Sequence, residues 1–254
     1  MKRVDRIYAI RQALRTGNTS IGSWMQIPHA SVAEIMGQSG YDWVAVDMEH
    51  GAVSAHQLPD LFRALELGGT LPMARLAEGT VKDSKQALDA GAGGVIVPMI
   101  ESASQLVRVR DACRWPPAGS RGVGFSRANL FGKFFDEYVQ EAQAPLLVAM
   151  IEHINAVGHL DEILQVVGLD AIMIGPYDLS ASMGLTARFD DDDFVATMRR
   201  IHELCRKHSI PSGAHVVMPD TDALRTRITE GYQFLAYSID SVILREFQLT
   251  KGHD

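Results

Sequence analysis

Polar residues with different chemistry follow four short apolar segments of the 254-residue sequence. One segment runs into Asp47-Met48-Glu49-His50, and the others lead to Arg75, Glu152 and Asp178. Carboxylates bind hard divalent cations, an arginine can stabilise an oxyanion, and a histidine can move a proton near neutral pH. These residue types together predict metal-assisted chemistry on an oxygen-rich substrate.

Glu152 and Asp178 follow consecutive apolar segments, so their carboxylates could share one octahedral ion with water in the remaining positions. Magnesium, manganese and cobalt suit such a site. The ion could chelate a 2-oxo acid and act as a Lewis acid, while Arg75 stabilises the enolate and His50 moves the proton. No lysine ends an expected strand, which counts against Schiff-base chemistry.

Each of these residues also has a structural alternative. Asp178 could be a helix N-cap, His50 a capping histidine and Arg75 a surface residue. A structural role suits Glu152 less well, because an unpaired charge beside an apolar strand is costly. The shared position of all four residues after apolar segments favours a joint function.

Short apolar segments alternate with longer helical patterns along the chain, which is typical of βα units around a parallel sheet. A doubly wound open sheet shares this pattern, but eight strands and this length favour a single (β/α)8 TIM barrel with its active site at the carboxyl ends of the strands. The expected strands are 21–26, 43–47, 71–75, 94–98, 146–152, 171–175, 211–215 and 234–238, and the clearest expected helices are 30–40, 55–67, 81–90 and 103–114.

Residues 115–144, between the fourth and fifth expected strands, are too long for a plain connector and are rich in proline and glycine. We expect this segment to be a functional loop over one end of the barrel. It would belong to one domain that spans residues 1–254.

The composition indicates a globular chain that acts on small molecules. The formal charge of −7 and 46% hydrophobic content give no indication of nucleic-acid binding, and no stretch has the apolar length of a membrane span or a signal peptide. Cys113 and Cys205 lack metal-ligand spacing and are expected to be buried, reduced thiols. We therefore expect a cytoplasmic protein.

Several motifs in a fixed order resemble the HpcH/HpaI aldolases, which are class II pyruvate aldolases with a barrel of the phosphoenolpyruvate/pyruvate-like superfamily. The resemblance covers about residues 22–244. It rests on Tyr41-Asp42-Trp43 before Asp47-Met48-Glu49-His50, on Asp89-Ala90-Gly91-Ala92 with Val97-Pro98-Met99, on Trp115-Pro116-Pro117-Ala118-Gly119-Ser120-Arg121-Gly122-Val123-Gly124, on Ile151-Glu152, and on Ile174-Gly175-Pro176-Tyr177-Asp178-Leu179-Ser180.

The resemblance implies roles for the acidic and basic residues. Glu152 and Asp178 would be the metal ligands, and Asp47 and Glu49 would lie beside the metal's waters. His50 would take the proton from the 4-hydroxyl group during retro-aldol cleavage. Two further residues complete the expected catalytic set: Arg75 would stabilise the pyruvate enolate, and Asp89 would raise the basicity of His50.

Substrate contacts are also implied. The backbone around Gly175, Pro176 and Tyr177 would receive the substrate carboxylate. Met150 stands where the best-known pattern has a glutamine, and Tyr177 where it has a smaller residue, so the natural substrate is left open. The long loop supplies candidates for selecting the aldehyde, with a packing role as the alternative for the phenylalanines: Phe125, Arg127, Phe131 and Phe134.

The implied reaction is reversible cleavage of a 4-hydroxy-2-oxo acid to pyruvate and an aldehyde, dependent on Mg²⁺, Mn²⁺ or Co²⁺. Family members are commonly hexamers with exchanged C-terminal helices, so a homo-oligomer is expected. A citryl- or malyl-coenzyme A lyase is one alternative, although the basic cluster that nucleotide phosphates require is not evident. A barrel that binds without catalysing is the other.

Overall fold

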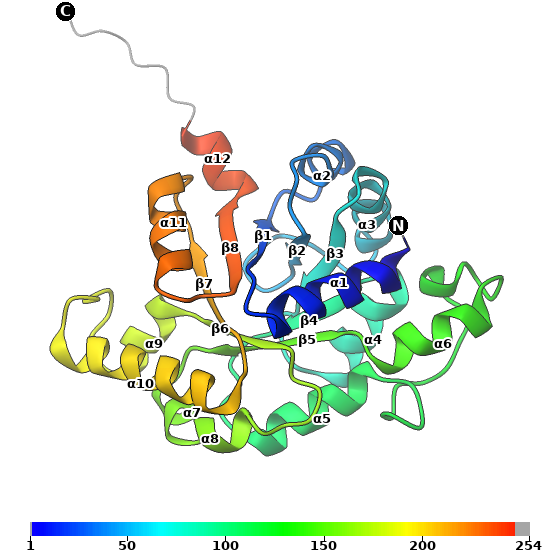
Figure 1. The fold of residues 1–254 in the computed structure, drawn as a ribbon. Helices are drawn as coiled ribbons and strands as arrows, with labels where there is room; N and C mark the ends of the chain where they lie inside the picture. Colours follow the sequence, from blue (N-terminus) through cyan, green and yellow to red (C-terminus); the bar gives the residue numbers. More distant parts are fainter. Residues whose placement is uncertain (1, 247–254) are drawn as a thin grey trace, which may run out of the picture.

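Eight parallel strands close into a barrel in the computed structural model, which describes residues 2–246 (Figure 1). Each strand pairs with its neighbours in chain order, and β8 pairs with β1. The predicted (β/α)8 barrel is confirmed, and the open-sheet alternative is wrong. The strands are β1 (Ser20–Met25), β2 (Trp43–Asp47), β3 (Leu71–Arg75), β4 (Gly94–Val97), β5 (Leu146–Ile151), β6 (Ala171–Ile174), β7 (Ser212–Val216) and β8 (Phe234–Ile239).

The strand bounds follow the sequence closely. Strands β2 and β3 have the predicted bounds, and the other six differ by one residue at one or both ends. Strand β7 begins at Ser212 rather than Pro211, which has no N–H to donate within a sheet. Apolar and β-branched residues dominate because a parallel strand is covered on both faces.

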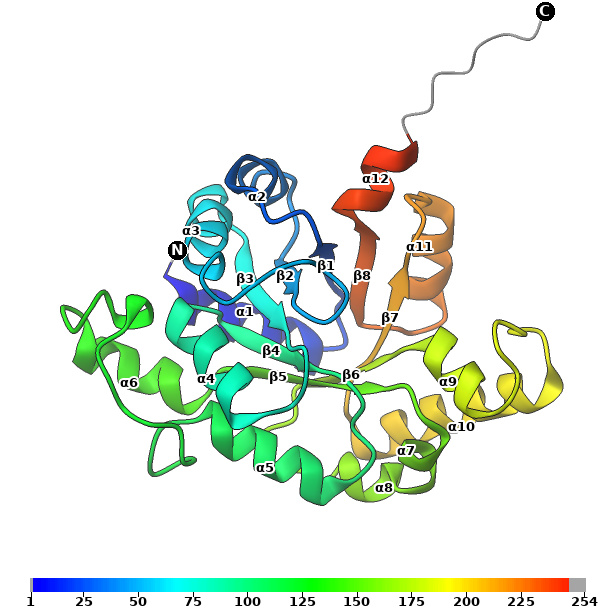
Figure 2. The same cartoon turned by 180° about the vertical axis from the view of Figure 1, so that it is seen from behind.

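Helices surround the barrel in both ribbon views (Figures 1 and 2). Helix α4 has the predicted bounds, with Thr80 as its N-cap and Gly91 at φ 107° after its last turn. The helices are α1 (Arg3–Arg15), α2 (Ala30–Gly37), α3 (Leu58–Gly68), α4 (Val81–Ala90), α5 (Ala103–Cys113), α6 (Phe135–Gln143), α7 (Ile154–Gly158), α8 (Leu160–Ile163), α9 (Pro176–Ser182), α10 (Asp192–His208), α11 (Thr221–Thr229) and α12 (Asp240–Glu246), with a 3₁₀ turn at Arg127–Asn129.

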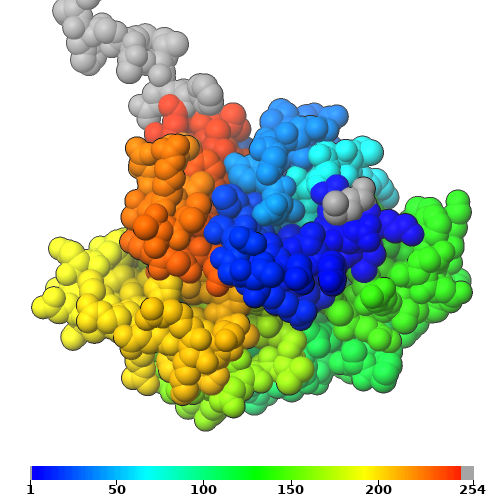
Figure 3. Space-filling view, viewed as in Figure 1, coloured from blue at the N-terminus to red at the C-terminus, as the bar shows by residue number. Residues whose placement is uncertain are grey.

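Helix α1 covers the end of the barrel where the strands begin. Its Ile7, Ile10 and Leu14 are buried in one cluster with Trp43 and Phe234, the first residues of β2 and β8. The rings of Trp43 and Phe234 stack with their centroids 4.4 Å apart. Figure 3 shows α1, in dark blue, lying across the middle of this face. Side chains therefore fill the barrel at this end.

The long segment 115–144 contains the 3₁₀ turn and α6, and it packs near the strand starts. Arg127 forms an ion pair with Glu66 and donates to the carbonyl of Ala90, at the ends of α3 and α4. Arg3 of α1 donates to the carbonyl of Ala128 and forms an ion pair with Glu141. The segment therefore does not cover the carboxyl ends of the strands of its own barrel.

This position corrects the interpretation of four loop residues. None of them lines the mouth cavity of the described chain, and Arg127 is engaged with α3 and α4 instead. The phenylalanines are not core residues either, because their side chains are exposed. Within one chain none of the four is placed to select the aldehyde, but a packing role holds for Phe125, whose ring meets that of Phe135 edge-on at 5.7 Å. The four residues are Phe125, Arg127, Phe131 and Phe134.

Both cysteines are free and buried, as predicted. Burial raises the pKa of Cys113 to about 11 and that of Cys205 to about 12, so both thiols stay protonated near neutral pH. In the described part of the chain, no helix has the length and apolar character to cross a membrane.

Candidate active site

A cavity of about 230 Å³ opens at the carboxyl ends of the strands. Side chains from seven of the eight strands, or from the residues just after them, converge on it, and only β4 contributes none. Most residues predicted to be functional belong to this lining, but Glu49 and Asp89 do not. The lining is Trp24, Gln26, Asp47, His50, Arg75, Met150, Glu152, Met173, Ile174, Gly175, Pro176, Tyr177, Asp178, His215, Val217 and Ile239.

A two-pronged ion pair fixes Arg75. Asp47 and Arg75 face each other as the last paired residues of β2 and β3. Arg75 Nε donates to Asp47 Oδ1 at 2.9 Å and Nη2 donates to Oδ2 at 2.7 Å. Burial raises the pKa of Asp47, but the bonds and charge of Arg75 outweigh burial, so the pKa lies below its usual value. Because Arg75 is buried, its surface-residue alternative is wrong.

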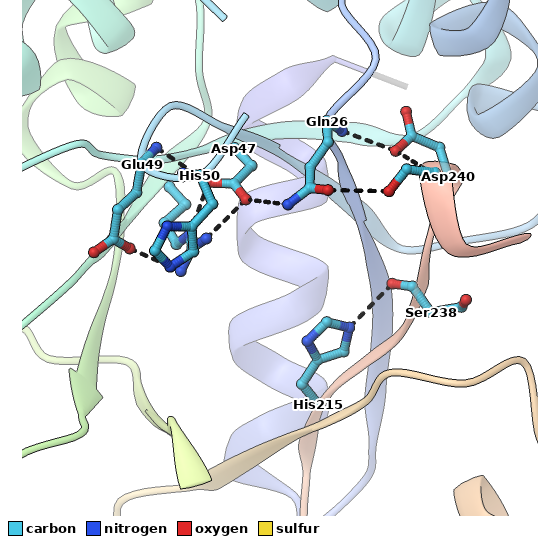
Figure 4. Close-up of polar contacts among 9 residues, drawn as sticks. Gln26, Asp47, Glu49, His50, His215, Ser238 and Asp240 are labelled. Carbon is cyan, nitrogen blue, oxygen red and sulfur yellow. Dashed lines mark hydrogen bonds and ion pairs between the residues drawn. The ribbon is translucent and has the colours of Figure 1, made fainter. Parts of the chain in front are cut away.

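Asp47 also organises the turn that carries His50. Its Oδ1 accepts from the backbone N–H groups of Glu49 and His50 at 3.1 Å each, and its Oδ2 accepts from Gln26 Nε2 at 3.0 Å. Figure 4 shows this network running from Asp47 through Gln26 to Asp240 at the start of α12. Every side-chain oxygen of Asp47 is thus engaged by the protein.

Glu49 approaches the same guanidinium from the other side. Its Oε2 lies 2.7 Å from Arg75 Nη1, although the angle is too poor for a hydrogen bond and the oxygen has no such partner among the described residues. Burial raises the pKa of Glu49 against the opposing charge of Arg75. The guanidinium of Arg75 therefore lies between two carboxylates, those of Asp47 and Glu49.

Glu152 is buried and its carboxylate is positioned by a strained residue. Oε1 accepts from the backbone N–H of Met99 at 2.7 Å, and Met99 adopts φ 50°, in the left-handed region. Burial, together with the carboxylates of Glu49 and Asp178, raises the pKa of Glu152 to about 7. A buried carboxylate facing two others is suited to a cation.

Asp178 stands at the rim of the cavity, in the first turn of α9. The N-cap of that helix is Gly175, with no side-chain cap bond, so the capping alternative for Asp178 is wrong. Gly175 also leaves room for the neighbouring carboxylate, because a Cβ there would lie 2.6 Å from Glu152 Oε2. Pro176 and the exposed Tyr177 continue the rim, and Tyr177 contacts the ring of Phe189.

His50 and Asp89 do not meet in one chain. His50 is exposed at the cavity, seven residues before the N-cap of α3, so its capping alternative is wrong. Asp89 lies at the C-terminal end of α4, near the strand starts, where burial raises its pKa and the charges of Arg121 and Lys85 lower it. The predicted effect of Asp89 on His50 therefore stays a prediction and requires a second copy of the chain.

The donor set fits a divalent cation only in an open site. Glu152 and Asp178 follow neighbouring strands and line one cavity, and their mutual repulsion would be relieved by positive charge. In residues 2–246 no group of three or more His, Cys, Asp or Glu side chains is arranged to hold a metal. Two carboxylates would leave most positions to water and substrate, as the sequence predicts.

Among the lining residues that were not predicted, three have polar or aromatic side chains: Trp24 and Gln26 at the end of β1, and His215 in β7. Trp24 presents its ring to the Arg75 guanidinium at 4.9 Å. His215 is a polar residue inside an otherwise small and apolar strand, and that contrast is a signal that the sequence contains. The signal could have identified it as a site residue.

The sequence is similar to known aldolases over nearly its whole length. The family model described as HpcH/HpaI aldolase/citrate lyase matches residues 20–246. A hydroxypyruvate/pyruvate aldolase of Roseobacter denitrificans is 35% identical over 238 residues, covering 92% of this chain and 91% of that protein. A 2-keto-3-deoxy-L-rhamnonate aldolase of Salmonella gallinarum is 35% identical over 241 residues, covering 93% and 88%.

A solved structure agrees with the fold. The crystal structure of an HpcH/HpaI aldolase/citrate lyase family protein from Burkholderia cenocepacia superposes with a TM-score of 0.87 at 29% identity. It covers 94% of this chain and 95% of that chain. The likeness extends over nearly the whole barrel.

Proposed function

The chain belongs to the HpcH/HpaI aldolase/citrate lyase family, and we propose that it cleaves 4-hydroxy-2-oxo acids reversibly at the mouth of its barrel. It is a carbon–carbon lyase of the pyruvate aldolase type. The products of cleavage are pyruvate, or a related 2-oxo acid, and an aldehyde. The observation that carries the site assignment is the convergence of Arg75, Glu152, Asp178 and His50 on one cavity.

The polar residues of the cavity are proposed to act at different points of the cleavage reaction. His50 takes the proton from the 4-hydroxyl group, the C3–C4 bond breaks, and its electrons form an enolate on the oxo-acid fragment. Arg75, held by Asp47 and Glu49, donates to the enolate oxygen. Protonation at C3 then gives the 2-oxo acid. A divalent ion held by Glu152 and Asp178 would polarise the 2-oxo group as a Lewis acid.

The substrate carboxylate is proposed to bind at the backbone of Gly175, Pro176 and Tyr177, with Met150 on the inner wall. The structure gives Asp47 and Glu49 contacts with Arg75, so their proposed part is to position that arginine and, beside it, the waters of the ion. The cytoplasmic location and the oligomer expected from the sequence stay predictions.

The coenzyme A alternative has no support at this cavity. Its lining contains one arginine, Arg75, and no lysine among the described residues. Nucleotide phosphates are bound by clusters of basic side chains or by helix N-termini. The small cavity is better matched to a short oxo acid.

A pyruvate-release assay over several 4-hydroxy-2-oxo acids, with and without a chelator, tests the proposal. The Glu152→Gln variant should lose tight Mn²⁺ binding, and its activity should fall by about two orders of magnitude. Glu137→Gln makes the same chemical change on exposed α6 and is the matched control. Full activity in a metal-stripped preparation, or unchanged Mn²⁺ affinity in the Glu152 variant, would refute the metal assignment.

A further inference from the structure

Two histidines line the mouth cavity, and the mechanism uses His50 but leaves His215 without a role. His215 is the fourth residue of β7 and is half-buried. Its ring centroid lies 5.7 Å from that of Trp24, and the Trp24 ring also contacts the Arg75 guanidinium. His215 is therefore on the side of the cavity where the enolate oxygen is proposed to bind.

The hydrogen bond to Ser238 decides where the proton of His215 resides. Nε2 lies 3.1 Å from the backbone carbonyl of Ser238, which is drawn as a dashed line in Figure 4. A carbonyl oxygen can only accept, so Nε2 must carry the hydrogen. Burial, together with the charge of Arg75, lowers the pKa of His215 to about 4. The ring is thus neutral near pH 7, and Nδ1 has a free lone pair.

Nδ1 is an acceptor without a donor. No hydrogen bond joins it to another residue in the part of the chain that the structure describes, and it is not among the fully covered unpartnered atoms. The same cavity is also lined by Val217 and Ile239, whose side chains have no hydrogen-bonding groups. A ligand group that donates one hydrogen bond would match this atom.

We propose that His215 is a specificity-determining residue whose Nδ1 accepts a hydrogen bond from a hydroxyl group on C3 of the oxo-acid half of the substrate. The inference rests on the proposed aldolase function. A 3-hydroxy-2-oxo acid carries such an O–H group, whereas the methyl group of pyruvate has no donor. The enzyme would accordingly prefer hydroxypyruvate to pyruvate as the nucleophile in aldol addition.

The position of His215 assigns the hydroxyl to the oxo-acid half. Arg75 is proposed to bind the oxygen on C2, and C3 is the next carbon along the chain. Trp24 contacts both Arg75 and His215, so the two side chains lie on one stretch of the inner wall. The side chain of Tyr177 is exposed at the rim, and the aldehyde half would extend past it toward solvent.

The test compares donors at constant acceptor. The Mn²⁺-loaded wild type and the His215→Leu and His215→Gln variants are assayed with hydroxypyruvate or pyruvate and acetaldehyde, which lacks a hydroxyl group. His215→Leu should lower the ratio of kcat/KM for hydroxypyruvate over pyruvate about tenfold. His215→Gln keeps an acceptor and should retain most of the preference. Val217→Ala, which changes the shape of the same wall without a polar atom, should leave the ratio unchanged.

Binding gives a second readout. Tryptophan fluorescence, to which Trp24 contributes, is titrated with each oxo acid in the same variants. The Kd for hydroxypyruvate should rise about tenfold in His215→Leu while that for pyruvate changes little.

An unchanged donor ratio in His215→Leu overturns the proposal. So does a loss that follows the aldehyde, detected with pyruvate as donor and glycolaldehyde against acetaldehyde as acceptors. A wild type inactive with every donor and acceptor contradicts the aldolase function instead. In that case the fluorescence titration still decides whether His215 discriminates the hydroxyl group.

Discussion

Arg75 shows how a single side chain can serve both folding and chemistry. Its fork of donors joins the carboxylate of Asp47 in the plane of the guanidinium, Glu49 approaches Nη1, and the ring of Trp24 covers one face. A lysine could supply the charge but not two parallel bonds in this geometry. These contacts preorganise the Arg75 side chain for substrate binding.

The Arg75→Lys variant should therefore lower kcat/KM for pyruvate release by about two to three orders of magnitude, because the donor to the enolate oxygen is displaced. Steady-state kinetics on the cleavage reaction would measure the loss. Arg63→Lys, on the exposed surface of α3, is the control for the same substitution. A variant within threefold of the wild type would remove Arg75 from this role.

The buried imidazole of His215 should also affect stability. Its pKa is about 4 in the folded chain and 6.5 in the unfolded one, so between these pH values only the unfolded chain binds the proton. The contribution to folding is complete above pH 6.5 and is lost as the pH falls toward 4. Between pH 7 and 4.5, the wild type should lose about 2 kcal/mol more unfolding free energy than His215→Leu. Urea denaturation at the two pH values measures this difference, and equal losses would contradict it.

At this scale the sequence identifies charged residues at or just after the ends of strands more readily than residues in the interior of strands. Glu152 and Arg75 are evident because a charged residue ends an apolar run. Trp24 and His215 lie inside β1 and β7, where the direction of each side chain depends on the strand register. Register is set by pairing with distant strands and by the irregularity between β1 and β8, which no local pattern contains.

Among the elements, the junction of β6 and α9 controls the carboxylate of β5. Gly175 lies so close to Glu152 that a methyl group would contact both its Cβ and its Oε2. Placing this glycine after the strand therefore lets the two carboxylate-bearing segments approach each other. The local sequence of α9 and the metal site are linked through this contact.

The Gly175→Ala variant should weaken Mn²⁺ binding at least tenfold, because the added methyl group displaces the Glu152 carboxylate. Isothermal titration calorimetry with Mn²⁺ measures the change. Gly158→Ala, where an added Cβ meets nothing within 4 Å, is the control. Equal affinities in the two variants would show that Glu152 can move without loss of the ion.

Elements with strong local patterns were predictable, and the long segment was not. Strands β2 and β3 and helix α4 agree in both bounds because apolar periodicity and caps define them locally. The position of residues 115–144 depends instead on Arg3, Glu66 and Ala90, which lie far away in the sequence. The length of the segment predicted a functional loop, but these distant contacts determine which end of the barrel the segment covers.

In the whole molecule, His50 and Asp89 stand at opposite ends of the barrel. If Asp89 acts on His50 at all, the two must come from different subunits of an oligomer. His50→Ala and Asp89→Asn homo-oligomers should each be impaired, by about two orders of magnitude or more for His50→Ala. Mixed oligomers of the two variants should regain activity, because some interfaces pair an intact His50 with an intact Asp89.

Subunit mixing after partial dissociation, followed by the pyruvate-release assay, measures this recovery. A monomeric protein, as determined by sedimentation, would contradict the arrangement. Full activity of Asp89→Asn would likewise remove Asp89 from the catalytic set. Mixtures of wild type with either variant give the reference for random assembly.

Helix α1 affects the order in which the two cleavage products can leave the barrel. It covers the barrel where the strands begin, and within residues 2–246 it contributes nothing to the lining of the reaction cavity. Both cleavage products must then leave through the mouth of the cavity. The aldehyde, near the rim, is released first, and the 2-oxo acid, beside Arg75, is released last. At high concentration, the 2-oxo acid would therefore occupy the inner part of the cavity and act as a product inhibitor of cleavage, even where the aldehyde is scarce.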